Sequence, residues 1–435
     1  MGAGIVKAEP LWWEDAGAPA APPQQDLPPE VDLVIVGAGL TGLSAARTAA
    51  RGGRSVLCLD AGAPGIGASS RNGGMVGGGH RLSIETLQAM FGHDLATRIL
   101  REAHLDSHAF VRTLQREEAI SCDYVENGRF RGLWRDRDYD ATGRALDRLK
   151  ALIPLEAEMR PRARQHEDVA TDLYRGGTIY LRHGGLNPAK WVAGLMGAAR
   201  RASALVQGHT PVLGVEGSGT AFEVRTTRGT VRGRDVLIAT NGYTPACLPG
   251  LRRRVVPVPS FIVATEELGA DTVRALFPTN RMIVETRDRH CYFRASPDGT
   301  RVVFGGRAAM FDIPEAVAQA QMRGLLLQVF PGLAGVRLSH SWRGRTGFSF
   351  NYLPNVGRIE GIWHALGYSG SGNAMAPWLG HKAALAILGD PEAETAFART
   401  GLPTRPWYRG TPWFLPLADI ALRAKDARNA IRRDG

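Results

Sequence analysis

The segment VDLVIVGAGLTG, at residues 31–42, constrains the fold of this chain more than any other. Its first six residues form a short apolar run that predicts a buried strand, and the Ala-rich stretch after it predicts a helix. The glycines therefore lie in a strand-to-helix turn, the setting of a dinucleotide site. We expect Gly37 to make the tight turn, Gly39 to let the backbone approach a pyrophosphate, and Gly42 to let the helix pack closely on the strand.

A second apolar run, at residues 55–59, predicts a neighbouring strand that ends at Asp60. This acid follows Gly37 by a little over twenty residues, the interval at which a carboxylate accepts hydrogen bonds from the adenosine ribose. We expect the phosphates to lie on the N–H groups at the start of the intervening helix. Strand, helix, strand and acid thus come in the order that predicts a dinucleotide-binding βαβ unit.

A glycine-rich loop, GIGASSRNGGMVGGG at residues 65–79, follows directly. Its glycines permit positive φ angles and a close backbone approach to a flat ligand, while Ser69, Arg71 and Asn72 supply hydrogen-bond donors. A bare linker could have this composition. Its position just after the ribose-binding strand favours further contact with the cofactor.

Charge and cysteine content limit the partners of this chain. The net charge is +11, but the excess is almost entirely scattered arginine, so we expect a solvated basic surface and no nucleic-acid partner. Cys58, Cys122, Cys247 and Cys291 are far apart and form no CxxC or metal-ligand spacing. Because the N-terminus has no apolar leader and no run approaches a membrane span, we predict a cytoplasmic protein with free thiols.

The remaining segments predict further elements. His104 and His108 are four residues apart on a predicted helix, but without an HExxH motif or a third ligand they indicate a packed pair and no metal site. The expected elements are an extended Pro-rich arm at 1–30, helices at 82–118, 140–153, 187–202 and 375–388, a hairpin at 122–133 around Asn127 and Gly128, and a strand at 235–240.

Seven motifs occur in the order seen in FAD-dependent oxidoreductases of the D-amino-acid oxidase superfamily. They are VDLVIVGAGLTG, GASSRNGG, GGLNPAKWVAGL, VLIATNGYTPACLPGL, YFRASPDG with FGGR, LPNVGRIEGIWHALGYSGSGNAMAPWLG and LPTRPWYRGTPWF. Within that superfamily the chain looks most like the γ-glutamylputrescine oxidoreductase branch. The resemblance implies an α/β fold with a discontinuous, glutathione-reductase-like FAD domain and a mixed-sheet substrate domain. It also implies oxidation of an amine to an imine.

The resemblance divides the chain into an arm (1–30), an FAD domain (31–110, 180–250 and 340–390), a substrate domain (111–179 and 251–339) and a tail (391–435). The GYSGSGNA motif precedes a helix whose positive end could face the N1 and C2 carbonyl of the flavin. The predicted FAD contacts are Gly37, Gly39, Leu40, Thr41, Gly42, Asp60, Ala61, Ala68, Ser69, Arg71, Asn72, Gly73, Gly74, Met75, Val212, Thr240, Asn241, Gly344, Gly367, Ser369, Gly370, Ser371 and Gly372.

The chain departs from its apparent relatives at three places. Where α-amino-acid oxidases of the superfamily generally carry a carboxylate-binding arginine, this chain has Thr346, with Arg345 beside it. No cysteine follows Cys291 to attach a flavin, so we expect non-covalent FAD. Residues 301–307 offer no lysine of the kind that activates oxygen in sarcosine-oxidase-like relatives.

The catalytic candidates are Tyr292, Arg294, Trp342 and Arg345, although packed strand residues or a surface arginine would explain them equally well. The favoured function is oxidation of a small-molecule amine, with O2 or another acceptor taking the electrons. Amino-acid oxidation or tailoring of a secondary metabolite on the same scaffold is one alternative. The other is a peripheral membrane quinone-linked dehydrogenase, whose basic helix at 418–433 would insert Ile420, Leu422 and Ile431.

Overall fold

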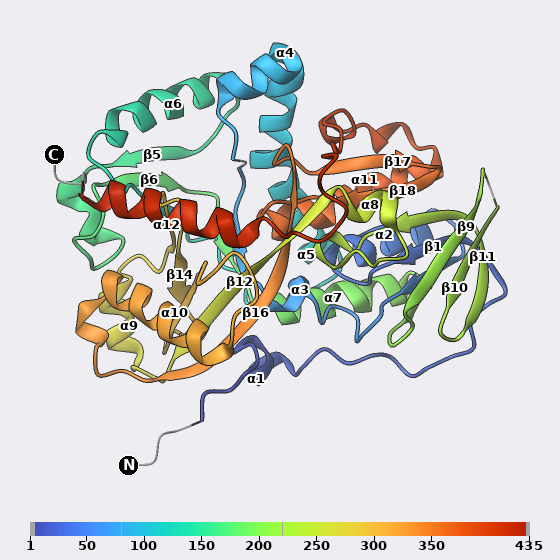
Figure 1. Cartoon of the computed structure of the whole chain (residues 1–435), viewed down its shortest axis with the longest axis horizontal. Helices are drawn as coiled ribbons and strands as arrows, with labels where there is room; N and C mark the ends of the chain where they lie inside the picture. The colour runs from blue at the N-terminus through green and yellow to red at the C-terminus, as the bar shows by residue number, and fades with distance from the viewer. Residues whose placement is uncertain (1–4, 80, 220, 432–435) are drawn as a thin grey trace.

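Two eight-stranded β-sheets organise the chain, as the computed structural model in Figure 1 shows. The structure describes residues 5–79, 81–219 and 221–431. The first sheet has the order β17-β18-β11-β1-β2-β8, with β10 and β9 extending from β11. Its strands are β1 (Glu30–Val36), β2 (Val56–Leu59), β8 (Leu205–Gln207), β9 (Val212–Ser218), β10 (Ala221–Thr226), β11 (Gly229–Ile238), β17 (Asn355–Ile359) and β18 (Ile362–Leu366).

The predicted parallel nucleotide-binding sheet is confirmed. Strand β1 pairs in parallel with both β2 and β11, and both of its faces are buried. Leu33 and Ile35 pack in the core that includes helix residues, whereas Val34 and Val36 pack toward the β9–β10–β11 meander. A strand buried on both faces reads as a continuous apolar run, which is why this element was recognisable.

The second sheet is mixed and has the order β16-β12-β15-β14-β13-β4-β6-β5. Strand β16 belongs to this sheet along its whole length, so the predicted FAD-domain range 340–390 begins inside a strand of the other sheet. The strands are β4 (Arg129–Gly132), β5 (Ala157–Arg160), β6 (Gly177–Tyr180), β12 (Val255–Thr265), β13 (Met282–Glu285), β14 (Tyr292–Ala295), β15 (Val302–Gly306) and β16 (Leu338–Ser349); β3 (Met75–Val76) pairs with β7 (Gly184–Gly185) separately.

The helices agree with the predicted positions, with one interruption. The predicted helix 82–118 is divided, because Gly92 has non-helical angles and residues Glu102–Asp106 form a π-helical turn. The α-helices are α1 (Trp12–Ala16), α2 (Leu40–Arg51), α3 (Ala68–Arg71), α4 (Ile84–Arg101), α5 (Ser107–Glu117), α6 (Asp138–Leu152), α7 (Pro188–Arg201), α8 (Pro249–Arg252), α9 (Ala270–Leu276), α10 (Glu315–Val329), α11 (Gly372–Leu388) and α12 (Leu415–Ile431). Asn187 caps α7 as expected, its side-chain oxygen accepting from the N–H groups of Ala189 and Lys190.

The hairpin predicted at residues 122–133 is wrong. Strand β4 pairs with β6 and β13, and Val125 instead forms an isolated bridge with Gly185. Gly128 does turn the chain, with φ +83°. The two arms of that turn then join different partners, because the larger sheet offers β4 two neighbours from distant parts of the chain.

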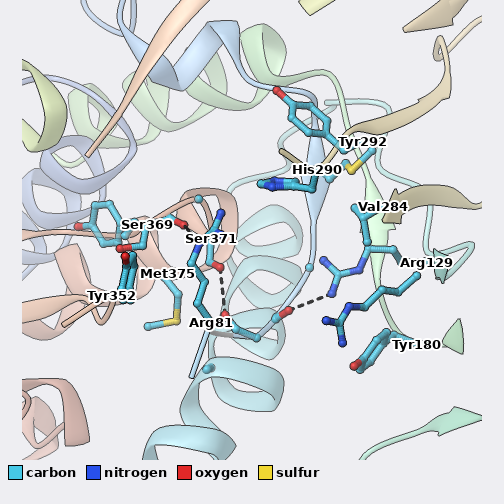
Figure 2. A pocket seen from close by; sticks show the side chains of 18 of the residues that line it. Arg81, Arg129, Tyr180, Val284, His290, Tyr292, Tyr352, Ser369, Ser371 and Met375 are labelled. Carbon is cyan, nitrogen blue, oxygen red and sulfur yellow. Dashed lines mark hydrogen bonds between the residues drawn. The ribbon is translucent and has the colours of Figure 1, made fainter. Parts of the chain in front are cut away.

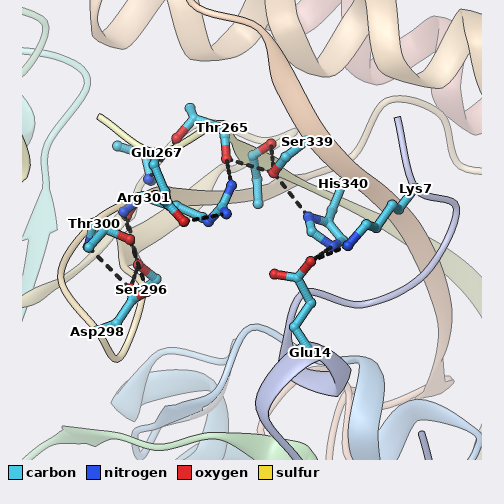
Figure 3. A network of polar contacts seen from close by, with 12 residues as sticks. Lys7, Glu14, Thr265, Glu267, Ser296, Asp298, Thr300, Arg301, Ser339 and His340 are labelled. Atoms are coloured by element: carbon cyan, nitrogen blue, oxygen red, sulfur yellow. Dashed lines mark hydrogen bonds and ion pairs between the residues drawn. The ribbon is translucent and has the colours of Figure 1, made fainter. Parts of the chain in front are cut away.

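The N-terminal arm is extended except for the five-residue helix α1, and it is fixed to the second sheet (Figure 3). The backbone of Lys7 exchanges hydrogen bonds with Ser339 and Ser341 on β16. Its ammonium group pairs with Glu14, which also lies 3.3 Å from the buried ring of His340. These contacts hold α1, and with it Trp12, against strand β16.

Helix α12, at the other end of the chain, exposes part of its apolar surface. Ile420 is 65% exposed and Leu417 64%, whereas Leu422 is half-buried. The side chain of Ile431 lies outside the described residues. Among the helices of the described segments, none is both long enough and apolar enough to span a membrane.

Candidate active site

Two adjoining cavities lie between the sheets. The first, which we call the dinucleotide cavity, has a volume of about 800 Å³ and is lined by the strand-to-helix turn and by Asp60. The second has a volume of about 740 Å³, and we call it the arginine cavity because eight arginines line it. The two cavities share a wall formed by Ala68, Arg71, Asn72, Gly344, Arg345, Thr346, Tyr368, Gly370 and Asn373.

The structure places most of the predicted cofactor contacts in the dinucleotide cavity. Lining it are Gly37, Gly39, Leu40, Thr41, Asp60, Ala61, Ala68, Ser69, Arg71, Asn72, Val212, Thr240, Asn241, Gly344, Gly370 and Gly372. Four others, Gly73, Met75, Ser369 and Ser371, line the arginine cavity. The remaining three, Gly42, Gly74 and Gly367, line neither cavity.

The glycines of the turn have the geometry that each predicted role requires. Gly37 has φ +104°, which favours glycine. A Cβ on Gly42 would lie 1.9 Å from the carbonyl oxygen of Gly37, so only glycine lets α2 approach the turn this closely. A Cβ on Gly39 would lie 2.7 Å from Ser69 Oγ, at the edge of the cavity. The turn therefore brings the first residues of α2 close to β1, at the edge of the cavity.

Asp60 is held at the end of β2 by two backbone groups. Its Oδ2 accepts from Ala38 N–H at 2.9 Å and its Oδ1 from Gly62 N–H at 3.0 Å. Burial raises the pKa of the Asp60 carboxyl, and these two donors act in the opposite direction. Each carboxylate oxygen keeps further acceptor capacity toward the cavity, which suits ribose hydroxyls.

We expect Asp60→Ala to weaken FAD binding by about 1–3 kcal/mol, the usual loss for a hydrogen bond to a charged group. Titration of apoprotein with FAD, followed by flavin fluorescence, measures this change. The matched control is Asp32→Ala, because Asp32 also accepts a backbone N–H, from Ser55, but lies outside the dinucleotide cavity. FAD affinity that is the same in wild type and Asp60→Ala would exclude the ribose role.

The glycine-rich loop is held rigidly beside the shared wall. Asn72 accepts from Gly74 N–H at 2.8 Å and from the side-chain amide of Asn373 at 2.8 Å. Two buried indoles hold adjacent carbonyls, with Trp342 Nε1 donating to Arg71 and Trp12 Nε1 to Asn72, both at 2.8 Å. This loop therefore takes its shape from its own backbone, from α11 and from the N-terminal arm.

The first turn of α11 also lies at the shared wall, where it contributes Asn373. Its N-cap, Ser371, makes no capping bond, so the terminal N–H groups keep their donor capacity. Asn373 Oδ1 is buried and has no hydrogen-bond partner among the described residues. The unpaired groups fit a polar ring system with acceptors and donors on its edge. None of the four cysteines lines either cavity, which supports non-covalent binding.

The structure separates the four catalytic candidates. Tyr292 lines the arginine cavity, and its hydroxyl lies 3.0 Å from Ser260 Oγ. Burial raises the pKa of Tyr292. Arg345 lines both cavities, but its guanidinium is 51% exposed and donates to Asp312 at 3.0 Å. Its charge is therefore paired with an acid that itself lines the dinucleotide cavity.

The other two candidates, Trp342 and Arg294, line neither cavity. Trp342 is 2% exposed and packs against Trp12. Arg294 donates to the carbonyl oxygens of Gly74 and Leu186, both at 3.1 Å. Their contacts support the glycine-rich loop, so these two residues are positioned to hold the site rather than to contact a substrate.

Sequence reasoning missed most of the arginine cavity. Figure 2 shows Arg81, Arg129, His290 and Tyr352 around it, and Arg307 lines the same space. These side chains come from separate loops and strands, with no motif spacing between them. The sequence signal for Arg307 is the FGGR motif, whose last residue it is.

His104 and His108 are both buried, as a packed pair would be, and the ring of His108 lies 4.9 Å from that of His183. Burial lowers the pKa of His108 to about 4. Within residues 5–79, 81–219 and 221–431, no group of histidine, cysteine and acidic side chains could hold a metal ion.

A comparison with family models matches residues 32–385 to the FAD dependent oxidoreductase family, DAO. The match covers the turn, the whole lining of the dinucleotide cavity and most of α11. The chain belongs to the DAO family. It is therefore an FAD-dependent oxidoreductase acting on the C–N bond of amines or amino acids.

Relatives in the DAO family agree with this assignment. A probable oxidoreductase OrdL of Rhizobium meliloti is 31% identical over 94% of this chain and 96% of its own length. The γ-glutamylputrescine oxidoreductase of Escherichia coli is 28% identical over 88% of this chain and 89% of its own length. Glycine oxidase from Geobacillus kaustophilus has the same fold, with a TM-score of 0.72 at 21% identity over 87% of this chain and all of that structure.

Proposed function

We propose that this DAO-family enzyme oxidises a primary or secondary amine of the γ-glutamylputrescine type, whose reacting carbon carries no carboxylate. The C–H bond next to nitrogen breaks and its hydrogen leaves as hydride, while the nitrogen lone pair forms C=N. The imine is then released and hydrolysed by water. Bound FAD supplies the two-electron acceptor for that hydride. The similarity to the γ-glutamylputrescine oxidoreductase of Escherichia coli supports the substrate type.

The shared wall is the observation that carries this proposal. At the strand position where an arginine would hold an α-carboxylate, Thr346 lines both cavities and is half-buried. The two arginines of the wall are engaged elsewhere. Arg345 pairs with Asp312, and Arg71 donates to the Ile66 carbonyl and lies 4.7 Å from the ring of Trp13. The Thr346 side chain itself offers no cation, and an α-carboxylate buried there without a paired cation costs several kcal/mol.

The test compares kcat/KM for acylated diamines with kcat/KM for glycine, D-alanine and D-proline. We expect the acylated diamines to exceed the amino acids by about 100-fold or more, because each 1.4 kcal/mol of lost pairing costs about tenfold. Thr346→Arg should narrow or invert that preference by supplying the missing cation.

Arg345→Ala is the control. It removes the charge next to Thr346, and the Arg345 side chain is paired with Asp312. The preference should persist in that variant. If wild-type enzyme oxidises simple α-amino acids best and Arg345→Ala selectively removes that activity, Arg345 binds the carboxylate and the proposal is wrong. Amino-acid oxidation, a competing function on the same scaffold, would be seen in the same substrate panel.

We further propose a cytoplasmic location and reoxidation by O2 or another acceptor. The four unpaired cysteines support a reducing compartment. The yield of hydrogen peroxide per substrate consumed, with and without a quinone, distinguishes an oxidase from a quinone-linked dehydrogenase.

A further inference from the structure

Two arginines of the arginine cavity, Arg81 and Arg307, meet on one aromatic ring. Their guanidinium carbons lie 5.2 Å and 5.1 Å from the centre of the Phe348 ring. They come from different parts of the chain, since Arg81 follows the glycine-rich loop and Arg307 follows β15. Both line the arginine cavity, and neither lines the dinucleotide cavity.

Neither guanidinium has an acidic partner among the described residues. Arg307 is 7% exposed, and its Nη1 is buried without a hydrogen-bond partner there. Arg81 donates only a long hydrogen bond, 3.4 Å, from Nε to the Ser369 carbonyl. Figure 2 shows the Arg81 side chain extending toward Ser369 and Tyr352 at the edge of the cavity. Two cations are thus held together with donors to spare.

The acids that line this cavity are already paired. Glu85 lies 2.7 Å from Arg148, Glu285 lies 2.5 Å from Arg287, and Asp288 lies 2.8 Å from Lys425. Eight arginines and three acids line the cavity, so its lining carries an excess of positive charge. His290, between these groups, adds no charge at neutral pH, because burial and then Arg307 and Arg81 hold its pKa well below the usual value.

Partly buried cations without counter-ions raise the free energy of the empty site, and an anion in the cavity would lower it. Guanidinium groups bind carboxylates through paired, charge-assisted hydrogen bonds. Burial lowers the pKa of Arg307 to about 10, and the nearby Arg81 adds to this effect. Arg307 therefore remains charged at neutral pH.

We propose that Arg81 and Arg307 form a subsite for a carboxylate at the end of the substrate remote from the carbon that is oxidised. This rests on the proposed amine oxidation and defines its substrate class as an amine joined by a chain to a carboxylate. Because the two arginines line the arginine cavity and not the dinucleotide cavity, they would hold this carboxylate on the substrate side of the shared wall. The positive lining also favours the neutral amine, the form that can give up hydride.

The experiment uses the holoenzyme and two amides of putrescine that differ at one group. N-glutarylputrescine ends in a carboxylate, and N-pentanoylputrescine has a methyl group in its place. We expect wild-type kcat/KM to favour the glutaryl amide by about 10- to 100-fold, the value of charge-assisted hydrogen bonds. Arg81→Gln and Arg307→Gln should each remove most of this preference by raising KM for the glutaryl amide, with kcat nearly unchanged.

Two further variants distinguish the effect of losing the positive charge from a general structural effect of the substitution. Arg307→Lys should retain part of the preference, because it keeps the positive charge. Arg98→Gln is the matched control, because Arg98 pairs with Glu394 at the surface and lines neither cavity. Perturbation of the flavin absorbance by glutarate measures binding without turnover, and it should weaken in both Gln variants but not in Arg98→Gln.

Equal kcat/KM for the two amides in wild-type enzyme would overturn the carboxylate subsite while leaving amine oxidation intact. An equal loss on both amides in the Gln variants would show a structural role and would also overturn it. If neither amide reduces the flavin while glycine does, the proposed function itself fails.

Discussion

Alanine at Gly42 should leave the protein without bound FAD and with a free energy of unfolding lowered by about 3 kcal/mol, the upper end of the usual cost of forced overpacking. The added Cβ would lie 1.9 Å from the Gly37 carbonyl oxygen and 3.1 Å from a methyl carbon of Ile35. Both neighbours belong to the strand and turn that form the dinucleotide site. Helix α2 must therefore move away from β1, and the phosphate-binding N–H groups move with it.

Gly380 on α11 tests the opposite side of helix α2, where α11 packs against it. A Cβ there would lie 2.2 Å from the Thr41 carbonyl oxygen, so Gly380→Ala should also separate α11 from α2. The control is Gly324→Ala in α10, where a Cβ meets nothing within 4 Å. That substitution should be neutral or stabilise by about 0.5–1 kcal/mol, since alanine is the better helix former.

Flavin-to-protein ratio after purification and thermal unfolding of the apoprotein measure the two effects separately. A Gly42→Ala protein that purifies with full FAD and an unchanged Tm would show that α2 tolerates the methyl group. The close strand–helix contact would then not be what fixes the dinucleotide turn.

Trp12→Ala should destabilise the protein by about 3–5 kcal/mol, the usual cost of removing a buried large aromatic side chain. Trp12 is 1% exposed, and its ring centre lies 6.1 Å from that of Trp342 in an edge-to-face arrangement. Its Nε1 also donates to Asn72, in the loop beside the shared wall. We therefore expect FAD retention to fall as well as Tm, although Trp12 lines neither cavity.

Trp12→Phe separates packing from hydrogen bonding. It keeps much of the apolar contact but leaves the Asn72 carbonyl without its donor, so we expect a loss of about 1–3 kcal/mol. Trp413→Ala is the control, because Trp413 is 60% exposed. If Trp12→Ala lowers Tm but leaves the FAD dissociation constant unchanged, the arm stabilises the fold without positioning the cofactor loop.

The nucleotide-binding half of this protein could be predicted because its determinants are local in sequence. Gly37, Gly39 and Gly42 lie within one turn, and Asp60 follows at the end of the next strand. Each residue type is required by a backbone angle or a close contact that the structure contains. The resemblance to DAO-family enzymes added the distant glycine-rich segments, which local patterns alone could not have joined.

The substrate half could not be predicted in the same way, because the arginine cavity is assembled from distant segments. Arg81 and Arg307 are more than two hundred residues apart, and only the fold brings both to Phe348. The sequence makes Arg294 and Trp342 catalytic candidates, because one is polar and the other aromatic. Their donors instead bind backbone carbonyls of neighbouring loops, a use that sequence does not distinguish from catalysis.

The hairpin at 122–133 failed for a related reason. A turn at Asn127-Gly128 is a local signal, and the structure does turn at Gly128. Strand β4 pairs with β6 and β13 instead of with the other arm of the turn, and β13 begins more than a hundred residues later. Local turn chemistry therefore predicted the bend but not the partners.

Anaerobic titration of the purified holoenzyme with γ-glutamylputrescine tests the central claim most directly. We predict that about one equivalent of this amine bleaches the oxidised-flavin absorbance, since each C–N oxidation delivers two electrons to one FAD. An unchanged spectrum with this amine, in a protein whose flavin glycine or another α-amino acid bleaches completely, would contradict the account.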